Sequence, residues 1–541
     1  MSNLSLEIYD TTLRDGNQAE GVSFSVSDKL KIVKMLDELG IDYIEGGWPG
    51  ANPKDVEVFQ QLKSIKLKHA IVTAFGCTRK ANVSPEDDNV LRQLLDADTD
   101  VITIFGKSWD FHVEHALCTT LEENLKMISD SVSYLISQGK RVFYDAEHFY
   151  DGYKNNPEYT LKTLESAYQA GAERLILCDT NGGCIPSEID EITRAVKERF
   201  PDAVLGIHAH NDSDLAVANT ITAVRAGIIQ IQGTMNGYGE RCGNANLCSI
   251  LPTLQIKMGY DVLADKLKNL VYVSRQISEI ANMGANEYAP YVGRSAFSHK
   301  GGVHASGVRK QSRTYEHVEP DLVGNVRKIL ISDQSGIASI KDKIKRLPTL
   351  TMKITDDDYR KILNHIKELE WQGYAFEDAD ASFELMVLGI LDLKPKFFEV
   401  KGFRVISDNI TGNDFLNTEA SVKVMVGDEI IHTVSEGDGP GHALDRALRR
   451  ALRPFYPKIR DFKLTDFKVR ILDSTDGTSA KTRVHVETSD GLERWDTVAV
   501  SRNIIEATYF AIVDSIDYGL MLNKQKPQNG FHELHELLKT I

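Results

Sequence analysis

The chain has 541 residues, of which 42% are hydrophobic and 26% charged, and its formal net charge is −15 at pH 7. This length predicts more than one domain, and the interspersed negative excess argues against a surface for nucleic acid or anionic membranes. No apolar run reaches the roughly 18 residues of a membrane-spanning helix, and the N-terminus lacks the features of a secretory signal, so we expect a cytoplasmic protein.

The first 235 residues alternate short apolar runs with amphipathic helical segments such as Ser27–Leu39, Leu121–Gln138 and Ser213–Ala226. Eightfold alternation over about 250 residues is typical of a (β/α)8 barrel, which is an α/β fold. The predicted strands are Leu6–Tyr9, Ile41–Ile44, Ala70–Phe75, Val101–Phe105, Arg141–Tyr144, Arg174–Cys178, Leu205–His208 and Ile228–Ile231.

Polar residues follow almost every predicted strand, and in such barrels the chemistry lies at the carboxyl ends of the strands. We therefore expect one rim of the barrel to collect a functional site. In chain order these residues are Asp15, Glu45, Lys107, Asp145, Glu147, Thr180, His208, His210 and the segment Gly233–Asn246.

Two of these positions carry the pattern of a metal site. His208 and His210 are two residues apart on a predicted strand, so their side chains share a face. Two imidazoles and the carboxylate of Asp15 are suitable ligands for a divalent metal. Arg14, next to Asp15, adds a fixed positive charge where an oxyanion could form.

Beyond the barrel, the segment Ser298–His304 is rich in glycine and histidine and is interpreted as a mobile or connecting segment. Its pair His299 and His304 has metal-like spacing, but we interpret the pair as structural. Three amphipathic helices are predicted at Gly336–Lys345, Asp356–Glu370 and Phe376–Gly389.

The last part of the chain contains the same pattern twice, three strands and then a helix, which indicates a separate module. We predict a catalytic barrel at 1–280, helical linker subdomains at 281–395 and a regulatory, dimerising α+β domain at 396–541. The first copy has strands at Phe403–Ser407, Thr418–Val426 and Glu429–Glu436 and a helix at Gly441–Leu452. The second copy has strands at Phe467–Asp473, Thr482–Glu487 and Arg494–Val500 and a helix at Asn503–Asp517.

These features together resemble the Claisen-condensing acyltransferases of the 2-isopropylmalate synthase family. The resemblance covers essentially the whole chain. The motifs that carry the resemblance are Asp10–Gly16, Cys178–Gly183, His208–Asp212, Gly239–Asn244 and Gly302–Ser306. The segments Gly46–Pro49, Phe105–Asp110 and Asp179–Gly183 resemble the branch that uses pyruvate.

The resemblance implies roles for individual residues. Asn244 would join Asp15, His208 and His210 as a ligand of Mn²⁺, Mg²⁺ or Zn²⁺, and Arg14 would support the reacting oxygens. Glu147 would take part in proton removal and Thr180 would bind the carboxylate of the 2-oxo acid. A second carboxylate, Asp145, lies two residues before Glu147; it is assigned to substrate binding, but it leaves the identity of the key acid open. His304 and Tyr315 would reach the barrel mouth from the partner subunit of a homodimer.

The implied reaction condenses acetyl-CoA with pyruvate and water to give (R)-citramalate and CoA, with feedback inhibition by isoleucine. Phe105, at the end of a predicted strand, is our candidate for the residue that excludes larger 2-oxo acids, although it could equally be barrel core. The alternatives are 2-isopropylmalate or homocitrate synthesis, a lyase that runs the reverse cleavage, and an amino-acid sensor with an inactive barrel.

Overall fold

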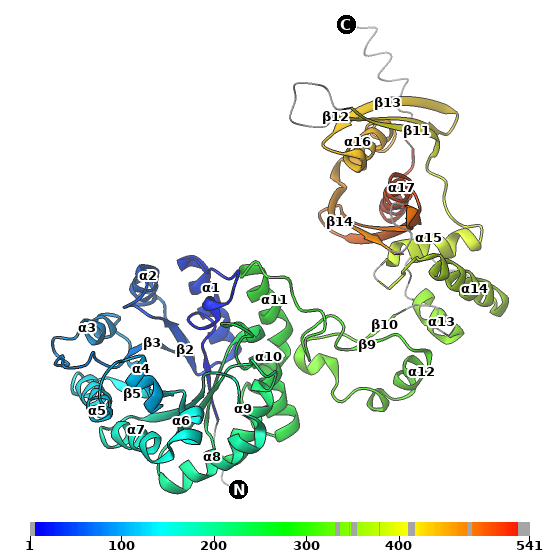
Figure 1. Ribbon diagram of the computed structural model, residues 1–541. Coiled ribbons are helices and arrows are strands. Elements are labelled where there is room, and N and C mark those ends of the chain that lie inside the picture. Colours follow the sequence, from blue (N-terminus) through cyan, green and yellow to red (C-terminus); the bar gives the residue numbers. More distant parts are fainter. Residues whose placement is uncertain are drawn as a thin grey trace. The chain divides into compact units, whose positions relative to one another are not determined.

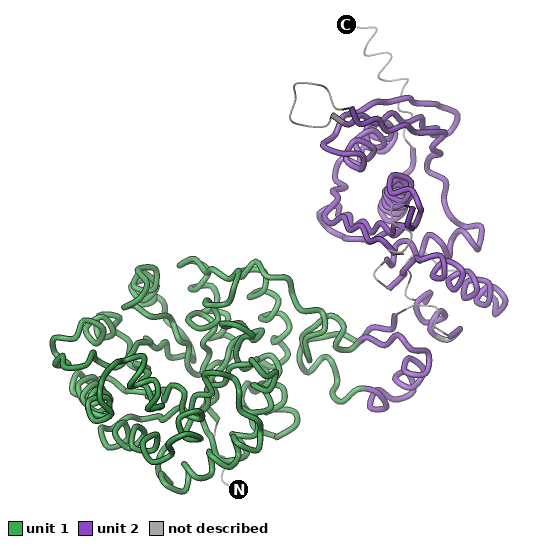
Figure 2. Tube along the Cα trace, viewed as in Figure 1, with its two compact units in different colours: residues 1–297, 316–327 green, residues 298–315, 328–541 purple. Residues whose placement is uncertain are grey.

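The computed structural model describes residues 6–330, 336–345, 347, 354–377, 379–408, 417–472 and 479–527. These residues form two compact units (Figure 2): residues 1–297 with 316–327, and residues 298–315 with 328–541. None of the described helices is long and apolar enough to cross a membrane.

The first unit is a closed barrel of eight parallel strands in sequence order, surrounded by helices (Figure 1). This confirms the predicted α/β fold class. The strands are β1 (Glu7–Asp10), β2 (Tyr43–Gly47), β3 (Ile71–Cys77), β4 (Val101–Lys107), β5 (Arg141–Glu147), β6 (Arg174–Asp179), β7 (Leu205–Ala209) and β8 (Gln230–Gly233).

The outer helices bury one apolar face each against the strands. In α1, for example, Ser25 and Asp28 form a capping box at the start, and Gly40 ends the helix in the left-handed conformation. The helices of this unit are α1 (Val26–Leu39), α2 (Pro53–Leu62), α3 (Asn89–Asp96), α4 (Asp110–His115), α5 (Leu121–Ser137), α6 (Phe149–Asn155), α7 (Pro157–Gln169), α8 (Pro186–Arg199), α9 (Ala216–Ala226), α10 (Leu247–Pro252) and α11 (Leu270–Ile280).

The barrel interior is filled in layers, which leaves space for a site only at the carboxyl ends of the strands. At the amino-terminal end, Arg174 forms a paired ionic contact with Glu7 at 2.7 and 2.9 Å. Above it lies a buried layer that includes Tyr9, Tyr43 and Phe143. The hydroxyl of Tyr9 in turn donates to Glu45 Oε1 at 2.9 Å, at the base of the polar rim.

The second unit contains a doubled module, which matches the repeat predicted from the sequence. Two three-stranded antiparallel sheets are each followed by a helix, and the first strand of each has a bulge near its start, at Val400–Gly402 and Leu464–Asp466. The elements are β11 (Glu399–Asp408), β12 (Asn417–Val426), β13 (Glu429–Gly437) and α16 (Pro440–Leu452), then β14 (Lys463–Ile471), β15 (Thr482–Ser489), β16 (Arg494–Ser501) and α17 (Ile504–Leu522).

Helices precede this module, as predicted, with shifts of one or two residues in the first two and a larger shift at the start of the third: α13 (Ile337–Lys345), α14 (Asp356–Gln372) and α15 (Asp380–Ile390). The third helix begins at Asp380 rather than Phe376, because Phe376 is buried against Phe383 in the core of these helices ahead of the helix start. Residue 378 lies outside the described residues.

The glycine- and histidine-rich segment, which we interpret as mobile or connecting, contains regular secondary structure. The short strand β9 (Ser298–His299) pairs with β10 (Lys328–Ile329), and α12 (Gly302–Lys310) follows directly. Gly301 is the N-cap of α12 in an extended conformation, and at a helix start glycine does not interrupt the hydrogen-bond ladder.

Candidate active site and metal centre

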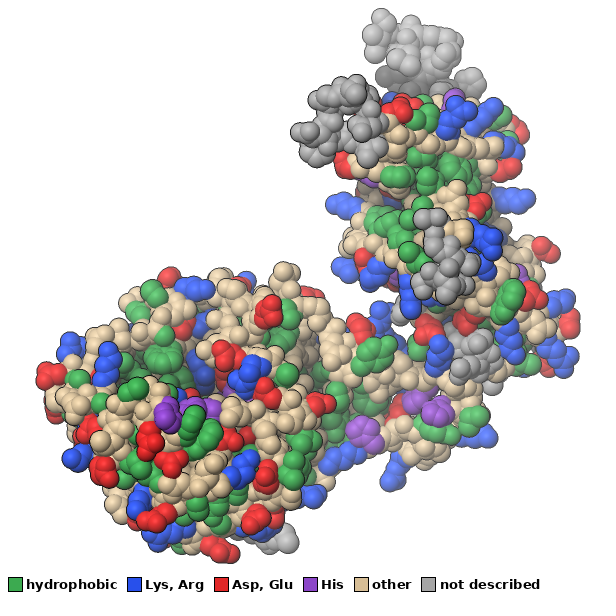
Figure 3. All heavy atoms as spheres, in the orientation of Figure 1, with side chains coloured by type: hydrophobic (Ala, Val, Ile, Leu, Met, Phe, Trp, Pro, Cys, Tyr) green, Lys and Arg blue, Asp and Glu red, His purple; other side chains and the backbone are tan. Residues whose placement is uncertain are grey.

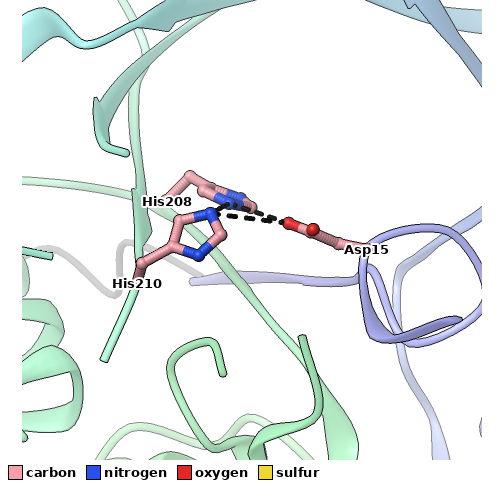
Figure 4. A group of neighbouring side chains, drawn as sticks. All are labelled: Asp15, His208 and His210. Atoms are coloured by element: carbon pink, nitrogen blue, oxygen red, sulfur yellow. Dashed lines mark hydrogen bonds and ion pairs between the residues drawn. The ribbon is translucent and has the colours of Figure 1, made fainter. Parts of the chain in front are cut away.

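Three side chains meet at the carboxyl-terminal rim of the barrel (Figure 4). Asp15 lies in the turn after β1, and His208 and His210 project together from the end of β7. Asp15 Oδ2 lies 3.1 Å from His208 Nε2 and 3.8 Å from His210 Nε2. All three side chains are buried, and their possible ligand atoms lie within 4.8 Å of one another. The structure thus brings together the three residues expected to bind a metal.

Asn244 joins this group from the loop after β8. Its Nδ2 lies 2.8 Å from Asp15 Oδ2 and 3.2 Å from His208 Nε2, and its buried Oδ1 has no hydrogen-bond partner among the described residues. The loop is held close by a β-bridge between His210 and Asn244. Glycine is required at 239, because a Cβ there would lie 1.8 Å from Asn244 Oδ1.

The electrostatics of the group favour a bound cation. Burial alone would raise the pKa of Asp15, but the Arg14 charge and the hydrogen bond from His208 outweigh it and hold that pKa well below its usual range. Burial and the neighbouring His208 lower the pKa of His210 to about 3, so its imidazole is neutral. An ionised carboxylate, imidazole lone pairs and an amide oxygen suit a divalent metal, so the residues fit such an ion.

Arg14 is held beside this group by two different contacts. Its Nε donates to Glu45 Oε2 at 2.5 Å, and its guanidinium lies 3.7 Å from the ring centre of Phe75. Glu45, in the middle of β2, is fully buried. The guanidinium is therefore fixed in the rim with one edge toward Asp15, at 3.5 Å.

Gln232 of β8 links His208 to Asp145. Its Oε1 lies 2.9 Å from His208 Nδ1, and its Nε2 donates to Asp145 Oδ1 at 3.2 Å. Because the amide nitrogen is used on Asp145, the amide oxygen faces His208 and accepts from Nδ1–H. Nε2 is therefore the ring nitrogen that can release its proton and offer a lone pair to a metal at the rim. Burial raises the pKa of Asp145 to about 7.

The remaining rim residues from β4, β5 and β6 surround the same space. Glu147 forms an ion pair with Lys107 from the neighbouring strand. Thr180 Oγ1 accepts a hydrogen bond from the backbone N–H of His148 at 2.9 Å. The hydroxyl hydrogen of Thr180 remains available to a ligand, because accepting uses only an oxygen lone pair.

An aromatic wall closes one side of the site. Phe105 stacks on Phe75 with ring centres 5.5 Å apart, and Trp48 meets both rings edge-on at 5.6 and 5.8 Å. The cavity enclosed by these residues has a volume of about 220 Å³. It is lined by Arg14, Asp15, Gln18, Trp48, Phe75, Phe105, Asp145, Glu147, Cys178, Thr180, His208, His210, Glu240 and Arg241.

His304 and Tyr315 lie in the second unit, where their rings stack with centres 4.1 Å apart. Their assignment to the catalytic site stays a prediction. Other rim residues had been assigned no role from the sequence, notably Trp48, Gln232 and Arg241. Arg241 Nη2 donates to the Thr180 carbonyl at 2.8 Å, while its Nε binds Asp212 at 2.7 Å. Its position inside the Gly239–Asn244 motif was the available signal.

Comparison with known proteins gives matches over the whole chain. Family models match residues 5–277 (HMGL-like), 291–373 (homocitrate synthase post-HMGL domain-like) and 377–520 (LeuA allosteric (dimerisation) domain). An (R)-citramalate synthase of Synechocystis sp. is 53% identical over 96% of each chain, and one of Geobacter sulfurreducens is 52% identical over 95% of this chain and 97% of its own. A probable 2-isopropylmalate synthase of Methanopyrus kandleri is 31% identical over 95% of this chain and 97% of its own.

The matched residues include the barrel with its candidate metal group and the doubled C-terminal module. The identity to the two (R)-citramalate synthases exceeds that to the probable 2-isopropylmalate synthase by about 20 percentage points. The chain therefore belongs to the HMGL-like family and, within it, to the group of the (R)-citramalate synthases, which are condensing enzymes of the acyltransferase type.

Proposed function

We propose that this protein condenses acetyl-CoA with pyruvate and water to give (R)-citramalate and CoA. The observation that supports this most directly is the buried group Asp15, His208 and His210, which lines a cavity of about 220 Å³ and is joined by Asn244 through its hydrogen bond to Asp15. A chelating 2-oxo acid with a small side chain fits a cavity of that size behind the aromatic wall. The relatives named (R)-citramalate synthase point the same way.

Each rim residue has a task in this reaction. A divalent metal held by Asp15, His208, His210 and Asn244 supplies Lewis-acid charge for the 2-oxo acid. The Thr180 hydroxyl donates to the substrate carboxylate.

The carbon–carbon bond forms between the acetyl methyl carbon and the ketone carbon. Glu147 removes a proton from the methyl group, with His304 and Tyr315 of the partner chain completing the site. Arg14 stabilises the negative charge that develops on the ketone oxygen. Water then cleaves the thioester and releases CoA.

We further propose that the doubled module joins two chains and binds isoleucine. Apolar side chains along one face of β14 are exposed: Phe467, Val469 and Ile471 are 41, 42 and 60% accessible. Hydrophobic side chains gather on the visible face of this unit in Figure 3. An uncovered apolar strand suits a partner copy, and the match to a dimerisation domain supports the assignment. Removal of residues 394–541 should abolish isoleucine inhibition; inhibition that survives would place the effector elsewhere.

The test of the main proposal is a thiol-release assay over pyruvate, 2-oxobutanoate, 2-oxoisovalerate and 2-oxoglutarate, with identification of each product. Pyruvate should give the highest kcat/KM and citramalate as product. A preference for 2-oxoisovalerate would instead assign 2-isopropylmalate synthesis.

The metal assignment has its own test. Chelation should abolish activity and Mn²⁺ should restore it. His208→Ala should lose both metal and turnover while staying folded, whereas His69→Ala, at an exposed histidine paired with Asp42, should keep both. Full activity of His208→Ala would overturn the metal assignment.

A further inference from the structure

The second sheet carries a ladder of positive charge on the face opposite α17. In the register of β14 and β15, Lys468 lies opposite His485 and Arg470 lies opposite Arg483. Positions two apart on a strand share a face, so the four side chains form two successive cross-strand pairs. The alternate residues of β15, Val484 and Val486, are buried in the core that α17 covers. The basic residues therefore occupy the other face.

This arrangement is unfavourable for folding on its own. Like charges placed directly opposite each other on antiparallel strands are destabilising, and this applies to Arg470 and Arg483. The other pair is compensated, because Lys468 pairs with Asp466 at 2.6 Å and His485 lies 3.6 Å from Asp496. Burial and the Arg470 charge lower the pKa of Arg483. Among the described residues, no carboxylate lies within ion-pair distance of Arg470 or of Lys367 on α14. Arg470 and Lys367 are thus cations without a carboxylate partner among the described residues, in a chain that is acidic as a whole.

A cavity of about 920 Å³ lies over this ladder, within the second unit. One wall is the sheet, and the other is the carboxyl-terminal part of α14. Six of its lining residues are Lys367, Trp371, Lys468, Arg470, Arg483 and His485. Two carboxylates also line it, and one of them, Glu377, pairs with Lys300. The volume lies within the range of small-molecule sites, which commonly occur where domains meet.

The two arginines of the ladder differ in their contacts. Arg483 Nε donates to the carbonyl of Gly373 at 2.6 Å, so Arg483 binds the backbone just after α14. Arg470 makes no such hydrogen bond to the described residues. Trp371 is 86% exposed at the mouth of the cavity. An exposed indole beside guanidinium groups is suited to stack on a flat ring while the cations bind attached phosphate groups.

We propose that this cavity binds an organic phosphate that carries a planar ring, at a site separate from the barrel. Two sources share this chemistry: a free nucleotide, and the adenosine phosphate portion of CoA. The site lies between α14 and the doubled module, so a ligand bound there would contact both the linker helices and the regulatory module.

The experiment uses the full-length chain and four probes: ATP, CoA, inorganic pyrophosphate and adenosine. Binding is followed by tryptophan fluorescence and by calorimetry. ATP or CoA should bind saturably, pyrophosphate should compete, and adenosine alone should bind at least tenfold more weakly. Arg470→Gln should weaken binding at least tenfold. Under the proposed function CoA also binds the barrel, so only the CoA binding that Arg470→Gln removes is assigned to this cavity. Whichever of ATP and CoA binds this cavity more tightly identifies the natural source of the phosphate.

The controls separate binding from folding. Lys361 lies on α14, as Lys367 does, but is paired with Asp357. Lys361→Gln should therefore bind the phosphate compounds as the parent chain does. Arg470→Gln should also raise Tm, because it removes a like-charge contact; if it fails to fold, Lys367→Gln gives the binding test. The proposal is overturned if no phosphate compound binds at millimolar concentration, or if the folded variant, Arg470→Gln or Lys367→Gln, binds as tightly as the parent chain.

Discussion

Gln232 offers a test of how the barrel prepares His208 for a metal. Its amide accepts from His208 Nδ1 at 2.9 Å and donates to Asp145 at 3.2 Å. Gln232→Leu keeps approximate volume but removes both contacts, so the buried imidazole can turn and can exchange its tautomer. Partners of this kind that orient a metal-binding histidine are worth about 10–100-fold in metal affinity. At about 1.4 kcal/mol per decade, that is about 1.4–2.8 kcal/mol.

The magnitude agrees with the cost of the hydrogen bond itself. Leaving a buried donor such as His208 Nδ1–H unsatisfied costs about 1–3 kcal/mol. The assay is a competition titration of the purified protein against a chelator with Mn²⁺ or Zn²⁺, which reports affinity without turnover. We expect a 10–100-fold weaker Kd for Gln232→Leu.

The chain supplies a matched control two residues earlier on the same strand. Gln230 is also fully buried and lies on the same face of β8, but its amide donates to Glu7 at 3.2 Å, at the opposite end of the barrel. Gln230→Leu should lower stability and leave metal affinity unchanged. Equal metal affinity in Gln232→Leu and the parent chain would refute the reasoning, as would an equal loss in both variants.

Three further changes test other parts of the site and the fold. Arg14→Lys keeps a charge but loses the fork that binds Glu45, so kcat should fall on the order of 10² or more; a change confined to KM, measured in the same assay, would reassign Arg14 to binding. Phe105→Ala opens the aromatic wall, so kcat/KM for 2-oxobutanoate relative to pyruvate should rise about tenfold; an unchanged ratio in a metal-loaded variant would exclude Phe105 as the gate. Burial raises the pKa of Asp517 from 3.8 to about 6 despite Lys394, so its protonated form is favoured in the folded chain and stability falls as pH rises through this window. Asp517→Asn should remove up to about 3 kcal/mol of that fall, which urea unfolding between pH 4 and pH 7 would measure; parallel pH profiles for the two proteins would contradict the assignment.

The barrel was predictable because its signal is local and repeated. Eight apolar runs were enough to place eight strands, yet every strand ends one to three residues later than predicted. The reason lies in the site itself. Asp10, Glu45, Lys107, Glu147 and Asp179 are polar and end the apolar run, but each still belongs to its strand. A hydrophobic pattern therefore stops where the functional rim begins.

The metal group was predictable for a different reason. Two histidines separated by one residue on a strand must point to the same face, so the sequence alone shows that His208 and His210 lie together. Asp15 lies in the turn after the first strand. Gln232 and Glu45 give no such signal, because a single glutamine or glutamate in a strand is compatible with many roles. Their importance depends on which side chain each one contacts in the fold. Gln232 contacts His208, 24 residues away in the sequence, and Glu45 contacts Arg14, 31 residues away.

The same argument applies to the positive ladder of the second sheet, and it explains why that feature was missed. Lys468 and Arg470 on one strand, and Arg483 and His485 on the next, look like ordinary alternation of polar and apolar residues, in which the polar face meets water. Only the register sets arginine against arginine and lysine against histidine. A register is fixed by burial of the opposite, apolar face, so the core imposes the unfavourable pair of Arg470 and Arg483. One substitution at Arg470 would relieve it, because the Arg470 side chain has no hydrogen bond or ion pair with the described residues. An uncompensated charge at such a position is what a binding site for an anion requires. The barrel rim offers a parallel: the buried Asn244 Oδ1 has no hydrogen-bond partner among the described residues, which is costly alone and becomes favourable when a cation is bound.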